Sequence, residues 1–198
     1  MMGNRKDTMR TAIAAAAMTA LIAVAASFPA VAAGDRPSYN RGTMTAFVMR
    51  KEPVALPDIA FKDGQGNPVT LADWRGRVVL INLWATWCAP CRREMPALDR
   101  LQVKLGGDDF EVLAISVDRK GAEASAKFLS ETGAENLALY VDETFKVARD
   151  LKAPGLPVTI LVDRQGREIG RVTGPAEWDS EDALALIGAA IEDRAAAQ

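Results

Sequence analysis

The chain has 198 residues, a length that suits one domain preceded by a targeting segment. Its 24 Lys and Arg residues nearly balance its 26 Asp and Glu residues, so the composition gives no basic footprint for nucleic acid. The absence of histidine excludes Ser–His–Asp and Cys–His catalytic pairs and histidine-ligated zinc, and two cysteines are too few for a four-thiolate metal site.

The first part of the chain has the pattern of an export segment. Basic residues within the first ten positions precede an uncharged stretch over 11–34, and small residues at Ala30-Val31-Ala32 suit cleavage by a signal peptidase. The alternative is an uncleaved anchor formed by 11–33, because about 20 apolar residues can cross a bilayer. We therefore expect 1–33 to be a signal peptide or an N-terminal membrane anchor, and either delivers the remaining chain outside the cytoplasm.

The segment that follows predicts a spacer and then a folded domain. Proline, glycine and scattered charges over 34–55 indicate a linker. The domain is expected over 56–195. It should begin with a β-hairpin, in which 59–61 and 69–71 flank the turn-rich sequence Asp63-Gly64-Gln65-Gly66-Asn67-Pro68.

A strand–helix–strand unit forms the predicted centre of the domain. The apolar run Val78–Trp84 is typical of a buried strand. Pro90 suits the first turn of a helix, where its missing N–H costs nothing, and apolar residues then recur at helical spacing until Gly106. A second buried strand follows over 110–117. The pattern predicts two parallel strands joined by a right-handed helical crossover.

The rest of the chain continues the alternation of helices and strands. Helices are expected over 122–132 and 144–151, strands over 137–141, 158–162 and 168–173, and a last helix after Asp179 or Ser180 with Leu184, Ile187 and Ile191 as its buried stripe. Helices alternating with strands, and a closing hairpin and helix, predict an α/β sandwich with a mixed sheet.

The two cysteines, Cys88 and Cys91, lie where the predicted strand passes into the predicted helix. Unpaired N–H groups and the positive end of the helix dipole favour a thiolate there, and a thiolate is the species that attacks disulfides. A purely structural bridge would close too small a loop to add much stability. We predict a redox-active dithiol, in which an exposed Cys88 attacks a disulfide and Cys91 resolves the mixed disulfide.

The motif Trp84-Ala85-Thr86-Trp87-Cys88-Ala89-Pro90-Cys91, together with Phe110-Glu111-Val112, Gly155-Leu156-Pro157 and Gly174-Pro175-Ala176-Glu177-Trp178, resembles the TlpA/ResA/DsbE branch of the thioredoxin superfamily. The resemblance covers 56–191, most of the chain. It implies a thioredoxin-like three-layer sandwich, with helices on both faces of a mixed sheet and an N-terminal β-hairpin. It also implies a TlpA-like thiol:disulfide oxidoreductase that needs no cofactor or metal.

The same resemblance implies a biological setting. It places the protein in the periplasm, soluble or tethered to the inner membrane. There it would reduce disulfides in partner proteins during the maturation of cytochromes or of cytochrome oxidase, and a membrane reductant of the CcdA or DsbD type would recharge it. No nucleic acid partner is expected.

The resemblance also assigns residues to the substrate face. Trp87 would belong to the docking surface beside Cys88, although a half-buried packing role is the alternative. Pro157 would follow a cis peptide bond next to the disulfide, and Leu156 would offer backbone groups to an extended substrate. Thr159 either helps to shape this face or is an ordinary strand residue.

Proton handling is predicted to depend on Glu94. Asn82 stands six positions before Cys88, where thioredoxin itself carries a buried acid, and an amide cannot accept that proton. Glu94 lies three residues after Cys91, on the same helical face, and burial would raise its pKa and let it tune the thiols. The alternative is an exposed acid that complements the helix dipole. For Glu177 and Trp178 only a packing role is expected.

Other functions compete with a reductase. The motif does not set the direction of electron flow, since a tenfold bias is only about 30 mV, so a thiol oxidase of the same fold is an alternative. A copper(I)-binding assembly module is another, although the chain has no histidine ligand. A peroxiredoxin would need a Pro-x-x-x-Thr-x-x-Cys loop, and this chain has Ile81 and Ala85 at the proline and threonine positions.

Overall fold

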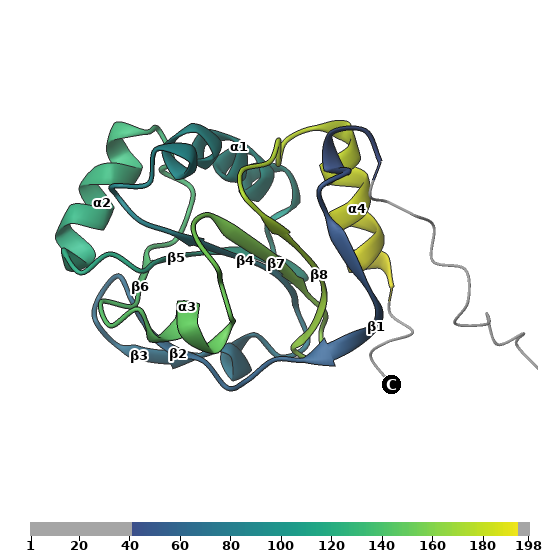
Figure 1. The fold of residues 1–198 in the computed structure, drawn as a ribbon, viewed down its shortest axis with the longest axis horizontal. Coiled ribbons are helices and arrows are strands. Elements are labelled where there is room, and N and C mark those ends of the chain that lie inside the picture. The colour runs from purple at the N-terminus through teal and green to yellow at the C-terminus, as the bar shows by residue number, and fades with distance from the viewer. Residues whose placement is uncertain (1–40, 194–198) are drawn as a thin grey trace, which may run out of the picture. The chain divides into compact units, whose positions relative to one another are not determined.

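The computed structural model describes residues 41–193 of the chain (Figure 1). The segment predicted to be a signal peptide or anchor, the first part of the predicted linker and the last two residues of the predicted domain lie outside these residues. Within 41–193, no helix combines the length and the apolar character that a bilayer crossing requires.

The described chain contains one eight-stranded sheet with the strand order β1-β8-β7-β4-β5-β6-β2-β3. The strands are β1 Val48–Ala55, β2 Ala60–Asp63, β3 Pro68–Thr70, β4 Val78–Trp84, β5 Phe110–Ser116, β6 Tyr140–Val141, β7 Val158–Val162 and β8 Arg167–Thr173. The sheet is mixed, because β4 pairs parallel with β5 and antiparallel with β7. The predicted hairpin is present as the antiparallel pair β2–β3.

Helices cover both faces of this sheet. They are α1 Ala89–Leu105, α2 Gly121–Glu131, α3 Lys146–Asp150 and α4 Glu181–Glu192, with 3₁₀ turns η1 at Gly42–Met44 and η2 at Leu71–Trp74. Helices α1, α2 and α4 lie on one face and α3 on the other (Figure 1), and a separate apolar cluster fills each side. The predicted three-layer α/β sandwich is therefore confirmed.

Strand β4 is central because every one of its residues is buried. Successive side chains of a strand point to opposite faces. Val78, Leu80 and Trp84 accordingly join the cluster under α1, whereas Val79, Ile81 and Leu83 join the cluster under α3. The same alternation places Asn82, the one polar residue of this strand, on the α1 side.

The prediction of a linker over 34–55 is wrong for the part of it that the structure describes. Residues 48–55 form β1, which pairs antiparallel with β8 at the edge of the sheet, while Met44 and Phe47 are buried in the cluster that includes α4. The sequence hides this strand because edge strands carry charges, proline and bulges, and here Pro53 lies where the register shifts.

The remaining elements confirm the predicted order with shifted ends. The helix bounds move by up to two residues, and the strand expected over 137–141 is reduced to the two residues of β6. Ser180 caps α4, its hydroxyl accepting a hydrogen bond from the Ala183 N–H. Of the predicted stripe of α4, Ile187 is buried, and Leu184 and Ile191 are partly buried and pack against the same cluster, while the buried Ala183 and Leu186 were not predicted.

Candidate functional site

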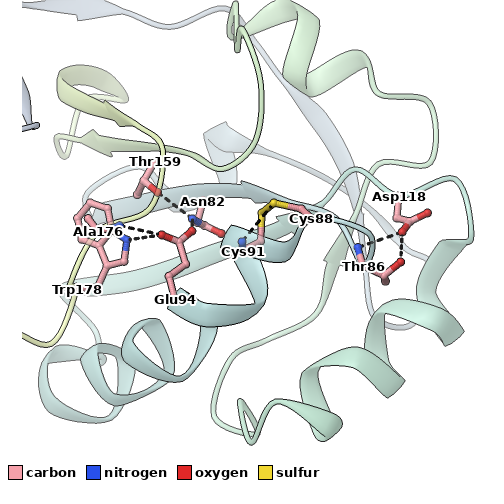
Figure 2. Close-up of a disulfide and its surroundings, with 9 residues drawn as sticks. All are labelled: Asn82, Thr86, Cys88, Cys91, Glu94, Asp118, Thr159, Ala176 and Trp178. Carbon is pink, nitrogen blue, oxygen red and sulfur yellow. Dashed lines mark hydrogen bonds between the residues drawn. A yellow bond between two sulfur atoms is a disulfide. The ribbon is translucent and has the colours of Figure 1, made fainter.

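The two cysteines form a disulfide at the start of α1 (Figure 2), with their Cα atoms 5.3 Å apart. Strand β4 ends at Trp84, a tight turn follows, and Cys88 is the N-cap residue of α1. Its sulfur accepts a hydrogen bond of 3.3 Å from the Cys91 N–H. This is the predicted junction of buried strand, cysteine and helix, and it aims the free N–H groups of the helix at the Cys88 sulfur.

The two cysteines differ in exposure less than predicted. Cys88 is only 4% exposed and Cys91 is fully buried, so the expectation of an openly exposed Cys88 is wrong for the disulfide form. Trp87, by contrast, is 64% exposed, and the half-buried packing alternative for this residue is wrong.

The turn that leads to Cys88 is tied to the end of β5 by Asp118. This buried carboxylate accepts hydrogen bonds from the Thr86 N–H at 3.1 Å, from the Thr86 hydroxyl and from the Lys120 N–H at 3.0 Å. Burial alone would raise the pKa of Asp118, but these hydrogen bonds hold its pKa below the ordinary value. Sequence reasoning missed this residue, although an acid directly after a buried strand was a usable signal.

Pro157 follows a cis peptide bond, as predicted. Val158 pairs with Leu83 across the antiparallel strands β7 and β4, so Pro157 lies one position further along, beside the end of β4. Leu156 is half-buried and packs against both apolar clusters. The fold thus brings the Leu156–Pro157 bond to the edge of the sheet from which the chain continues to Cys88.

Glu94 is buried on the sheet side of α1, one turn after Cys91 (Figure 2), so the alternative of an exposed acid is wrong. Its Oε1 atom accepts a hydrogen bond of 2.9 Å from the Asn82 amide. Its Oε2 atom accepts from the Ala176 N–H at 3.2 Å and from the Trp178 indole N–H at 3.3 Å. A carboxyl group from α1 is therefore held by groups from β4 and from the segment before α4.

Asn82 also donates a hydrogen bond of 2.8 Å to the Thr159 hydroxyl. The two residues are direct register partners on β4 and β7, and both are fully buried on the α1 side. Thr159 is thus part of the polar cluster under α1, and its position argues against a plain strand role.

The pKa of Glu94 is raised by burial to about 7, from an ordinary value of 4.5. Hydrogen bonds from Asn82, Ala176 and Trp178 oppose this shift without cancelling it. A carboxyl group with this pKa is suited both to accept and to release a proton near neutral pH, and Glu94 lies one helical turn after Cys91.

Trp178 has a role that the sequence did not reveal. Its side chain is fully buried, and its N–H donates to the Glu94 carboxylate. A buried tryptophan normally finds an acceptor for its N–H, which was the one available signal, but the sequence could not name the acceptor. Glu177 is exposed, and its backbone carbonyl accepts a hydrogen bond from the Ser180 N–H.

The Phe110-Glu111-Val112 motif belongs to a different cluster. Glu111 accepts hydrogen bonds from the Trp74 indole at 2.9 Å and the Tyr140 hydroxyl at 2.7 Å, and it pairs with Arg77. Glu111 lies near the start of β5, whereas the dithiol follows the end of β4. Because these two strands are parallel, Glu111 and the dithiol lie at opposite ends of them. Among residues 41–193, no group of three or more Cys, Asp or Glu side chains is placed to hold a metal.

Comparisons with known proteins bear on this geometry. Residues 54–167 match the model of the AhpC/TSA family. The thiol-disulfide oxidoreductase ResA of Geobacillus kaustophilus is 31% identical over 134 residues, which are 66% of this chain and 76% of ResA.

Two further proteins are similar. The thiol:disulfide interchange protein HelX of Rhodobacter capsulatus is 37% identical over 59% of this chain and 64% of its own length, just under two thirds. A solved structure from Chlorobium tepidum, assigned as the thiol:disulfide interchange protein DsbE, superimposes with a TM-score of 0.63 at 31% identity, over 71% of this chain and 97% of that one.

Proposed function

Because this chain belongs to the AhpC/TSA family and is a thiol:disulfide oxidoreductase of the TlpA/ResA/DsbE type in the thioredoxin superfamily, we propose that it acts as a reductase of protein disulfides. The observation that carries the proposal is the buried Glu94, which lies one helical turn after Cys91 and has a pKa of about 7. A reductase must remove a proton from its second, buried thiol, and this carboxylate is suited to receive it.

The reaction proceeds in two exchanges. The Cys88 thiolate attacks one sulfur of the partner's disulfide, which forms a mixed disulfide and releases a partner thiolate that takes a proton from solvent. Cys91 then gives its thiol proton to the Glu94 carboxylate, and the Cys91 thiolate attacks the Cys88 sulfur. The intramolecular disulfide forms and the second partner thiolate leaves. That thiolate is protonated from solvent, and Glu94 returns its proton to solvent.

Residues at the rim would recognise the partner. The exposed Trp87 supplies an apolar docking surface next to Cys88. On the other side, the chain around Leu156 and Pro157 would pair with an extended segment of the partner. The arrangement of both beside the end of β4 supports this assignment.

The setting we propose is extracytoplasmic, in the periplasm. The export pattern of 1–33 supports it, and the likeness to the TlpA branch supports partners that need free thiols before they take haem or copper, in cytochrome or cytochrome oxidase maturation. A membrane reductant of the CcdA or DsbD type would restore the dithiol. Whether 11–33 are cleaved or remain as an inner-membrane tether does not change the chemistry.

Trapping of covalent adducts tests the roles of the two cysteines. Cys91→Ser should accumulate mixed disulfides with periplasmic partners, because the first exchange still occurs and resolution does not. Cys88→Ser is the matched control, and it should accumulate few. Non-reducing electrophoresis followed by mass spectrometry would measure the adducts and identify the partner. Equal trapping by both variants would reject the assigned roles.

The direction of electron flow is tested by the reduction potential. We expect a value well below about −120 mV, the potential of the strong oxidant DsbA. Equilibration with glutathione or dithiothreitol buffers, followed by thiol alkylation, measures it. A potential in the DsbA range would instead support the thiol oxidase alternative.

A peroxidase and a copper-binding module have less support. Ala85 and Ile81 are buried apolar residues, so no threonine stands three residues before Cys88 and no proline seven residues before it, where a peroxidatic loop needs them. For copper, no Asp or Glu side chain among the described residues is placed to complete a metal site with the two sulfurs. Tight 1:1 binding of copper(I), with no disulfide reductase activity, would nevertheless favour the binding module.

A further inference from the structure

The side-chain amide of Asn82 is bonded in an asymmetric way. Its Nδ2 group uses both hydrogens, one on Glu94 Oε1 at 2.9 Å and one on Thr159 Oγ1 at 2.8 Å. Its Oδ1 atom is buried and has no hydrogen-bond partner among residues 41–193. Every described partner of Glu94 therefore donates a hydrogen bond to it. The Asn82 amide also carries an acceptor, Oδ1, that makes no hydrogen bond.

This arrangement satisfies only the ionised form of Glu94. Oε2 already accepts from two groups that can only donate, the Ala176 N–H and the Trp178 indole N–H. A proton received from a thiol must therefore be carried on Oε1, where the present neighbour is also an N–H donor. A protonated carboxyl needs an acceptor, and a buried O–H without one is costly.

Rotation of the Asn82 amide by half a turn gives this O–H an acceptor, at the cost of moving the NH₂ group to the buried place where Oδ1 now has no partner. Oδ1 then occupies the place of Nδ2, within reach of the same two oxygens. Thr159 allows this, because a hydroxyl can donate as well as accept. In one state the amide donates to a carboxylate and a hydroxyl oxygen. In the other state the amide accepts from a carboxyl O–H and a hydroxyl O–H. Only Oδ1 and Nδ2 exchange places, and the oxygens of Glu94 and Thr159 stay where they are.

We propose that Asn82 is a positioning residue whose side-chain amide rotates when Glu94 is protonated. Thr159 accepts a hydrogen bond from this amide in one state and donates one to it in the other. A proton from Cys91 is then held on Glu94 inside the fold, with an acceptor for its hydrogen bond. The proposal rests on the proposed role of Glu94 as proton acceptor. In the resolving step the S–H bond of Cys91 breaks and an O–H bond forms on Oε1. The amide neither gains nor loses a proton, and its rotation only presents Oδ1 to Glu94 in place of Nδ2.

The surroundings of Glu94 contain few other groups that titrate. Neutral side chains face it from β4 and β7, and the segment before α4 contributes an amide N–H and an indole N–H. The titratable neighbours are the dithiol of α1 once reduced, and the exposed Glu177 between Ala176 and Trp178. In the oxidised protein the cysteines do not titrate, so Glu94 and Asn82 can be followed there without interference.

Nuclear magnetic resonance of the oxidised full chain tests the rotation directly. The protein carries ¹³C at glutamate carboxyls and ¹⁵N at asparagine side chains, and Glu94→Gln and Asn82→Leu identify the signals. We expect the Asn82 NH₂ signals to shift with pH at the same midpoint as the Glu94 carboxyl. Contacts from the Asn82 NH₂ hydrogens to Glu94 and Thr159 should be present above that midpoint and lost below it.

Two variants sharpen the test. Glu94→Gln carries a permanent donor toward Asn82, so the Asn82 signals should stay in their low-pH form at every pH. Asn82→Leu removes a donor to the carboxylate, so the Glu94 midpoint should rise by about one pH unit. Asn136→Leu is the matched control, because this amide donates at 2.9 Å to another buried carboxylate of α1, Asp99, and its loss should leave the Glu94 midpoint unchanged.

The outcomes separate this proposal from the proposed function. If Glu94 titrates while the Asn82 signals and contacts stay fixed, the rotation is rejected and the role of Glu94 as proton acceptor stands. If the two titrate together but Glu94→Gln leaves the pH dependence of disulfide resolution intact, the rotation is upheld and the catalytic role of Glu94 is rejected. Should Asn82→Leu not fold, the titration of the unmodified protein still decides.

Discussion

Glu94 shows how one side chain acquires a function from its neighbours. Cys88 stands at a helix N-terminus, a position that generally favours a thiolate, whereas Cys91 lies within the helix and is fully buried, and burial generally favours a neutral thiol. The resolving step therefore needs a base inside the fold. A carboxyl with an ordinary pKa would be too weak a base at neutral pH, and burial against β4 corrects this.

Replacement of Glu94 by Gln should slow resolution of the mixed disulfide about 100-fold at pH 8 and abolish its rise near pH 7, because the proton acceptor is lost while the shape is kept. Single-turnover stopped-flow measurements over a range of pH would show this. Glu177→Gln is the matched control, an exposed acid two residues before Asp179, and its profile should match the unmodified protein. A Glu94→Gln profile that still rises near pH 7 would assign the base to another group.

At the scale of elements, β1 closes the sheet beside β8 and covers part of the core. Gly170 of β8 permits this close approach: a Cβ atom there would lie 2.4 Å from Cε1 of Phe47 and 2.7 Å from the Val48 carbonyl oxygen. The ion pair between Arg50 and Glu168 connects the same two strands, and Arg171 of β8 pairs with the same carboxylate. Residues 44–55 are thus a structural part of the fold.

Phe47→Ala should lower the free energy of unfolding by about 3–5 kcal/mol, because it empties a fully packed site under β8. Val48→Ala, at a neighbouring side chain that is 61% exposed, should change it by about 0.5 kcal/mol or less. Urea denaturation of the oxidised proteins measures both. Similar small losses for the two variants would mean that β1 is a loosely held segment.

At the scale of the whole molecule, the raised pKa of Glu94 links stability to pH. The ordinary value is 4.5 and the folded value about 7, so between these limits the folded protein binds more protons than the unfolded chain. Stability from this group is therefore complete below about pH 4.5 and is lost as the pH rises through about 7. The loss is the cost of ionising a carboxyl under a helix.

The stability of the unmodified protein relative to Glu94→Gln should fall by up to about 3 kcal/mol between about pH 4 and pH 8. Comparing the two proteins cancels the other groups that titrate. Denaturant unfolding of both oxidised proteins across this range provides the measurement. Parallel curves would show that Glu94 titrates alike in the folded and unfolded states.

The amino-acid sequence by itself determined the layers and the dithiol. The apolar run of β4 and the helical spacing after Pro90 are local patterns, and the Cys-x-x-Cys spacing at their junction needs no distant residue. Pro157 could be predicted as cis because a resemblance, not a local rule, assigned it. The dense alternation of strands and helices sufficed for the α/β sandwich.

Only the tertiary structure decided what surrounds Glu94. Asn82, Thr159 and Trp178 come from three segments separated by up to 96 positions along the chain, and nothing within any one segment indicates that the three side chains meet. The pairing of β4 with β7 makes Asn82 and Thr159 neighbours, and burial then converts their polarity into a requirement for hydrogen bonds. The sequence also hid β1, because an edge strand needs only one apolar face and a partner, and that partner lies more than a hundred residues away.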